Sequence, residues 1–119
     1  MAIDPTGADL KRFLAADQGP VVMLNLLRFR SDGGRERYLE YARALTEVLP
    51  RFGGEVLYAG DGDTPRVAED GQAWDAVLCV RYPSRAAFSQ MVADPGYQRV
   101  THLRTQALLE AVLQPTAPW

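Results

Sequence analysis

A single amide interrupts the most apolar stretch of the sequence. The segment VVMLNLLRFR runs from Val21 to Arg30 and carries Asn25 at its centre. A strand this apolar is expected to be buried on both faces, where an amide without a hydrogen-bond partner costs roughly 1–3 kcal/mol. The partner of Asn25 is therefore either the protein itself or a ligand. In a dry cavity, such an amide can bind a substrate carbonyl or stabilise an enolate oxygen.

His102 is the only histidine, so a general acid or base mechanism would depend on it first. On a helix, however, it would share a row with Gln98 and Gln106, which lie four residues away on each side. Such a row is typical of a solvated helix face. We keep His102 as a catalytic candidate beside this structural interpretation.

Several charged side chains fall on predicted strands. Asp75 is a candidate base, Arg28 and Arg81 are candidates for bidentate binding of a carboxylate, and Glu110 is a further polar candidate. The alternative is an ion pair of Asp75 with Arg81 or Arg28, and Glu110 carries the same ambiguity.

Aromatic side chains add a second type of candidate. Tyr58 and Trp74 can stack on an aromatic ligand. Tyr38 and Tyr41 can do the same, but they fall on an apolar helical stripe, which is more typical of a core.

The composition restricts the classes of protein to which this chain can belong. With 119 residues, 47% of them hydrophobic, the chain is expected to form one domain over 1–119. The net charge is -2 without a basic stripe, and no segment approaches the ~20 apolar residues of a membrane span. We therefore expect no nucleic-acid or membrane partner. Cys79 is the only cysteine, which excludes an internal disulfide and favours the cytoplasm.

Absent motifs restrict the chemistry further. The sequence has no glycine-rich phosphate loop after a strand, no Cys/His metal cluster, no serine elbow and no HExxH motif. We therefore expect no metal site and no cofactor, so any catalysis would depend on a pocket, an amide and one carboxylate or imidazole.

Turn and capping residues divide the chain into elements. A leader over 1–19 contains a short helix over 8–15 capped by Thr6, and a tail covers 115–119. The intervening sequence predicts strands over 21–30, 55–59, 73–83 and 109–114, helices over 38–52, 84–93 and 96–108, and a brief pairing over 66–69. This order is that of an α+β, ferredoxin-like βαββαβ fold whose four-stranded antiparallel sheet is covered by two helices, the second broken in two.

Both faces of the first strand are apolar, although two helices can cover only one face of a sheet. We expect Val22, Leu24 and Leu26 to lie under the helices and the set with Asn25 to face a second copy of the chain. Two sheets packed face to face would then enclose a cavity in an isologous dimer. By the same alternation, that cavity would collect Asn25, Asp75, Cys79, Arg81 and Glu110, together with Tyr58.

Four blocks, MLNLLRF, YLEYARALTEVLPRFGGEVLYAG, WDAVLCVRYPSRAAF and ADPGYQ, carry a family resemblance. From about Val21 to Leu113 the sequence resembles the proteins grouped as domain of unknown function 1330, within the dimeric α/β-barrel superfamily. That superfamily includes antibiotic-biosynthesis monooxygenases, muconolactone isomerases, haem-degrading enzymes and polyketide cyclases, which use the sheet cavity. The resemblance implies the ferredoxin-like fold and a homodimer, and it leaves the reaction open.

Three functions agree with these observations. The first is a cytoplasmic homodimer that binds a small organic metabolite and catalyses a cofactor-independent isomerisation, cyclisation or oxygenation. The second is a non-catalytic binding or accessory protein that uses the same cavity, and the third is a purely structural dimer. A cavity with several convergent polar groups favours the first two.

Overall fold

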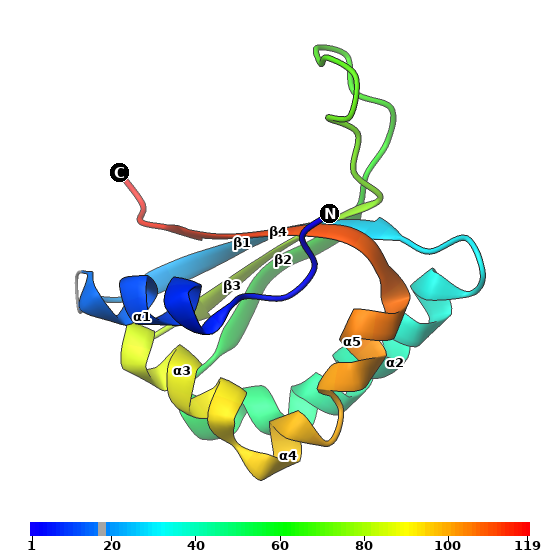
Figure 1. The fold of residues 1–119 in the computed structure, drawn as a ribbon. Helices are drawn as coiled ribbons and strands as arrows, with labels where there is room; N and C mark the ends of the chain where they lie inside the picture. The colour runs from blue at the N-terminus through cyan, green and yellow to red at the C-terminus, as the bar shows by residue number, and fades with distance from the viewer. Residues whose placement is uncertain (17–18) are drawn as a thin grey trace.

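The computed structural model describes residues 1–16 and 19–119 and forms one sheet with helices packed on one side (Figure 1). The strands are β1 (Val21–Phe29), β2 (Glu55–Asp61), β3 (Ala76–Tyr82) and β4 (Leu108–Thr116). They are antiparallel, in the order β2-β3-β1-β4. The helical segments under the sheet are α2 (Gly34–Val48), η1 (Leu49–Phe52), α3 (Arg85–Ala93), α4 (Pro95–Gln98) and α5 (Thr101–Ala107). The predicted α+β, ferredoxin-like sheet is confirmed.

Three helices begin at the capping residues that the sequence predicts, whereas α2 begins at Gly34, before the predicted start at residue 38. Thr6, Ser84 and Asp94 begin α1 (Gly7–Ala15), α3 and α4, and each side chain accepts a hydrogen bond from backbone N–H groups of the first turn. Gly53 ends η1 with a φ of 73°, a left-handed conformation that glycine adopts without strain. In the described part of the chain, no helix has the length and apolarity needed to span a membrane.

Several boundaries differ from the sequence prediction. The helix predicted over 96–108 is two helices, α4 and α5, because the chain turns at Val100, whose N–H donates to Tyr97 O at 3.0 Å. The pairing predicted over 66–69 is not formed. β4 extends to Thr116, so the first two residues of the predicted tail 115–119 belong to the sheet. The predicted leader 1–19 includes residues 17 and 18, which lie outside the described residues.

The faces of β1 are the reverse of the prediction. Val21, Met23 and Leu27 are at most 3% exposed and face the helices, whereas the set with Leu24 lies on the open face and is half-buried. Because both faces of β1 are apolar, the alternation of its residues does not show which face packs on the helices. The register with β3 decides it, since Met23 pairs with Val80 and Leu27 with Ala76, both of which are buried.

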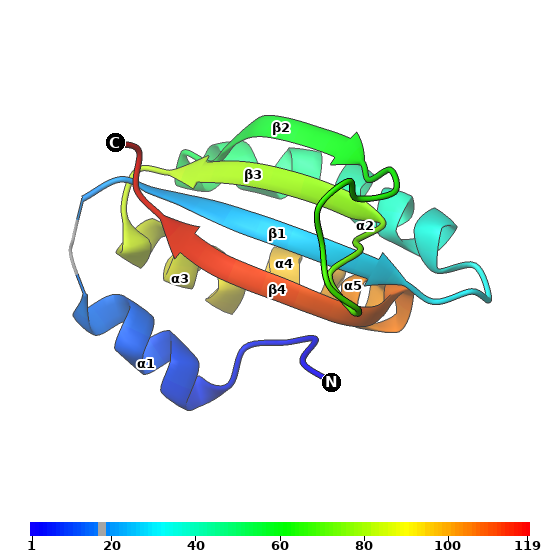
Figure 2. The same cartoon turned by 90° about the horizontal axis from the view of Figure 1, so that it is seen from above.

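The N-terminal segment lies along the β4 side of the molecule, with α1 beside the edge of the layer (Figure 2). The ring of Phe13 packs edge-on against Phe88 of α3, at 5.3 Å between centroids. Arg85 stacks on Phe13 and donates to its carbonyl oxygen at 3.2 Å. Near the start of the chain, Ala111 N–H donates to Ala2 O at 2.8 Å, which fixes this segment to β4.

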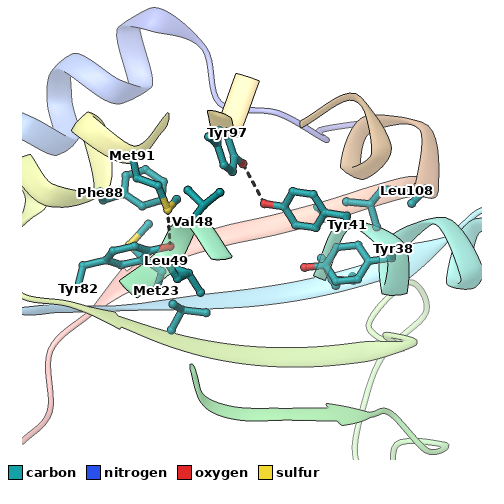
Figure 3. Close-up of a cluster of buried hydrophobic side chains, with 14 of the residues drawn as sticks. Met23, Tyr38, Tyr41, Val48, Leu49, Tyr82, Phe88, Met91, Tyr97 and Leu108 are labelled. Atoms are coloured by element: carbon teal, nitrogen blue, oxygen red, sulfur yellow. Dashed lines mark hydrogen bonds between the residues drawn. The ribbon is translucent and has the colours of Figure 1, made fainter. Parts of the chain in front are cut away.

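The core between sheet and helices combines aliphatic side chains with a group of aromatic ones (Figure 3). Tyr38 and Tyr41 on α2 lie with their rings 5.3 Å apart, and the hydroxyl of Tyr41 forms a 2.9 Å hydrogen bond with that of Tyr97 on α4. The hydroxyl of Tyr82 on β3 points at Met91 Sδ, 3.9 Å away. Burial raises the pKa of Tyr38 to about 12 and also raises the pKa values of Tyr41 and Tyr82.

These tyrosines predict a loss of stability in alkali. In the unfolded chain a tyrosine ionises near pH 10, whereas Tyr38 stays neutral in the fold until about pH 12. The stabilisation is therefore complete below pH ~10 and is lost as the pH rises through this window. Urea unfolding measured from pH ~9 to ~12 should show a falling free energy of unfolding. We expect Tyr38→Phe to make that fall less steep, by at most about 1.4 kcal/mol per pH unit.

The control is Tyr58→Phe, because Tyr58 is 57% exposed. This variant should keep the wild-type slope. If the curve of Tyr38→Phe also runs parallel to that of the wild type, Tyr38 is not held neutral by burial.

Candidate functional site

The predicted site residues lie on opposite faces of the sheet. Asn25 lies on the helix-facing side of β1, opposite Leu78 of β3. Arg28, Cys79, Arg81 and Glu110 lie on the open face, as the pairs Val22–Arg81, Leu24–Cys79 and Arg28–Glu110 require. Tyr58 pairs with Cys79 and belongs to the open face as well. The prediction that a single cavity collects Asn25 together with these residues is therefore wrong.

Arg28 and its neighbours on the open face have a structural role. The guanidinium lies 3.0 Å from Glu110 and 4.4 Å above the centre of the Trp74 ring. It also donates to Ala73 O at 2.7 Å and to Gly71 O at 3.1 Å. These contacts hold the base of the loop over 62–75, which rises from the open face (Figure 1). The ion pair that the sequence suggested for Arg28 thus forms with Glu110 and not with Asp75.

Asp75 and His102 both lie outside the space between sheet and helices. Asp75 immediately precedes β3, and its carboxylate accepts the N–H of Phe29 at 2.8 Å, which satisfies the end of β1. Its own N–H donates to Leu27 O, so it joins two strands. His102 is exposed on α5, as the row with Gln98 and Gln106 indicated, and it does not line the cavity. Neither residue is placed for catalysis there.

A cavity of about 380 Å³ lies inside the chain, between the sheet and the helices. Most of its lining is apolar, with Met23, Leu78 and Val80 from the sheet facing Leu45 and Met91 from the helices. Its edge includes exposed side chains of the β2 strand and of the N-terminal segment, where the cavity opens. A second hollow of about 570 Å³ continues under α1 and shares part of this lining. The N-terminal segment therefore covers one side of the space.

Several polar side chains with unused hydrogen-bonding capacity line this cavity. One N–H of the Asn25 amide donates to Met23 O at 3.2 Å, and no further partner within the described residues binds its second N–H or its oxygen. The hydroxyl of Tyr38 likewise has no hydrogen bond within the described part of the chain, although Tyr38 is only 6% exposed. The paired hydroxyls of Tyr41 and Tyr97 also line the cavity.

Arg104 is the site residue that the sequence analysis missed. Its side chain is 7% exposed, and Nη1 donates to Ile3 O and to Asp4 Oδ1, both at 2.9 Å. Nη2 is buried and has no hydrogen-bond partner among the described residues. A signal was present, because Tyr97, Arg104 and Ala107 follow the buried stripe of the helical region. An arginine on such a stripe needs a buried partner.

The cavity is suited to binding and stabilising negative charge. Tyr38, Tyr41 and Tyr82 stay protonated at neutral pH, because burial raises their pKa values, so they act as hydrogen-bond donors and not as bases. Within residues 1–16 and 19–119, no group of three His, Cys, Asp or Glu side chains is placed to hold a metal ion. Protonated tyrosines and a guanidinium are the groups that stabilise a carboxylate or a developing enolate oxygen.

Known structures share this fold. The RPA0582 protein of unknown function from Rhodopseudomonas palustris is 33% identical, covers 98% of this chain and 96% of its own, and superimposes with a TM-score of 0.89. More distant structures show the fold alone. A dimeric ferredoxin-like protein of unknown function from Jannaschia sp. CCS1 is 14% identical, with a TM-score of 0.64 over 84% of this chain and 100% of that one. Hydroxynitrile lyase from Passiflora edulis is 15% identical, with a TM-score of 0.63 over 84% and 98%.

Among curated proteins, none matches the sequence. The family model described as domain of unknown function (DUF1330) matches residues 33–113, which include α2, β2, β3 and α5. The family match covers more than half of the chain, and the Rhodopseudomonas palustris protein is similar over nearly all of it. The chain therefore belongs to the DUF1330 family.

Proposed function

We propose that this protein binds a small organic molecule in the cavity between its sheet and its helices. The observation that carries the proposal is a mostly apolar space of about 380 Å³ whose lining includes polar side chains with unused hydrogen-bonding capacity. Small-molecule sites have this size and this composition, with a few polar groups that fix the orientation of the ligand. Asn25, Tyr38 and Arg104 are these groups, and the apolar lining would hold the body of the ligand.

A cofactor-independent reaction is the second candidate. Neutral tyrosines and a guanidinium in a water-poor cavity favour any step in which negative charge develops on a substrate oxygen, as in isomerisations and cyclisations that pass through an enolate. Asn25 would contribute its free N–H to the same oxygen. Hydroxynitrile lyase from Passiflora edulis, an enzyme with a similar fold, agrees with a catalytic use of this architecture. No imidazole lines the cavity, so the substrate or a second group would have to move the proton.

Filling the cavity tests the proposal for binding. Ala42 lines it from α2, whereas the neighbouring Arg43 is exposed and does not. In an NMR screen of small organic fragments, we expect hits that shift the amide signals of Met23, Tyr38 and Ala42. Ala42→Trp should abolish those shifts by occupying the space, while Arg43→Trp should keep them. Hits that bind Ala42→Trp unchanged would show that the ligand lies elsewhere.

We propose in addition that the open face of the sheet pairs with the same face of a second copy. The face carries half-buried apolar side chains from three strands, among them Leu24, Leu26, Val77 and Val112. Figure 2 shows that no helix covers it. An apolar face of this kind is typical of a protein interface, and a dimeric protein of similar fold supports the assignment. The cavity itself is formed within one chain, so pairing would support it from behind.

This apolar face predicts the oligomeric state of the protein in solution. We expect sedimentation equilibrium to give a dimer for the wild type and a monomer for Leu24→Glu, because a carboxylate at the centre of the interface would be desolvated without a partner. Leu39→Glu is the matched control, since Leu39 is exposed on α2 and away from the sheet. A wild-type monomer at high concentration, or a dimer that withstands Leu24→Glu, would contradict the arrangement.

The single cysteine supports a cytoplasmic location, which we also propose. Cys79 is free and half-buried on the open face, where a thiol acts as a small apolar group.

A further inference from the structure

Arg104 leaves half of its guanidinium unsatisfied inside the protein. Nη1 is bound by the N-terminal segment, whereas Nη2 is buried without a partner among the described residues. Leaving a buried charged donor unpaired is costly, because the group has lost its water and gained nothing in return. Among residues 1–16 and 19–119, Arg104 is the only basic residue that lines the cavity, and Asp4 is the only acidic one. Asp4 is already used by Nη1, so no other acidic side chain of the described lining is available to neutralise Nη2.

We infer that the molecule bound in this cavity is an organic anion whose carboxylate pairs with Nη2 of Arg104. The inference rests on the proposed function and names the chemical class of its ligand. A carboxylate is the planar acceptor that matches the guanidinium fork, and such charge-assisted hydrogen bonds are about twice as strong as neutral ones. The apolar lining then requires an aliphatic or aromatic body behind the carboxylate.

The tyrosines support this assignment. The positive charge of Arg104 acts on both Tyr38 and Tyr41, where it opposes the larger effect of burial on the pKa. Tyr38, Tyr41 and Arg104 also line the same cavity. Tyr38 has no hydrogen-bond partner among the described residues, so its O–H is available to the second oxygen of the same carboxylate. A cation and a neutral donor in the lining of one cavity fit an anion better than a neutral amide, which would add its own unpaired donors.

Asp4 would compete with the ligand for Arg104. Its carboxylate accepts from Nη1 at 2.9 Å and from Thr105 Oγ1 at 3.1 Å, and its side chain is 46% exposed at the edge of the cavity. A ligand that binds the fork bidentately must displace Asp4 from Nη1. Even a ligand that binds Nη2 alone meets a cation whose charge Asp4 has partly neutralised. Removing the charge of Asp4 should therefore strengthen the binding of an anion and leave a neutral ligand unaffected.

Matched acids and amides test the inference. We would titrate the full chain with 3-phenylpropanoate and 3-phenylpropanamide, and with hexanoate and hexanamide, and follow the amide signals of Tyr38 and Ala42 by NMR. Within at least one pair, the acid should bind about tenfold more tightly than its amide, the gain expected from one charge-assisted hydrogen bond. Arg104→Gln should reduce this ratio to about one. Asp4→Asn should tighten the binding of the acid several-fold without changing that of the amide.

The controls separate the possible failures. Arg99→Gln removes an exposed arginine next to the same helix and should keep the wild-type ratio. Asp4→Asn alters an exposed side chain, so it provides a test even if Arg104→Gln does not fold. Amides that bind as well as their acids in both pairs would overturn the anion assignment and leave the proposed cavity intact. Acids and amides that both fail to shift these signals would overturn the assignment together with the proposed function.

Discussion

A guanidinium group buried beneath the sheet is the constraint on which the rest of the site depends. Arg104 cannot be packed like an aliphatic residue, because each of its N–H groups needs an acceptor once water is removed. The N-terminal segment supplies two acceptors through Ile3 O and Asp4, and this fixes the start of the chain to α5. The remaining amino group has no acceptor among the described residues, and the chain leaves a cavity in the same region. The free-energy cost of the unsatisfied Nη2 is explained if a bound ligand supplies the missing acceptor.

The two faces of the sheet carry out different tasks. On the helix side, Asn25, Tyr38 and Arg104 are among the polar residues that line a mostly apolar space. On the open side, Arg28 is surrounded by Glu110, Trp74 and two loop carbonyls, and its contacts fix the loop over 62–75. Arg28 and Glu110 thus have structural contacts on the open face, and the polar residues of the inner face are the candidates for chemistry that we propose. A second copy placed on the open face would leave the inner cavity undisturbed.

The elements could be predicted because their signals are local. Thr6, Ser84 and Asp94 cap helices through contacts within one turn, and Gly53 ends one through its own backbone geometry. The faces of β1 could not be predicted, because both are apolar and only the pairing with β3 distinguishes them. That error placed Asn25 with the residues of the open face, in a cavity between two copies of the chain, whereas Asn25 lines the cavity between the sheet and the helices of one chain. Arg104 was overlooked because arginine accounts for nearly all of the 13 basic residues, which makes any single arginine uninformative by type. Its position on a buried stripe was the informative property.

We place the ligand inside one chain, between the sheet and the helices, with its carboxylate on Arg104. A crystal structure of the protein with bound 3-phenylpropanoate tests this placement. We expect electron density for the ligand among Tyr38, Tyr97 and Arg104, with a carboxylate oxygen within hydrogen-bond distance of Nη2. Density on the open face beside Arg28 or Arg81, with the inner cavity empty, would contradict it.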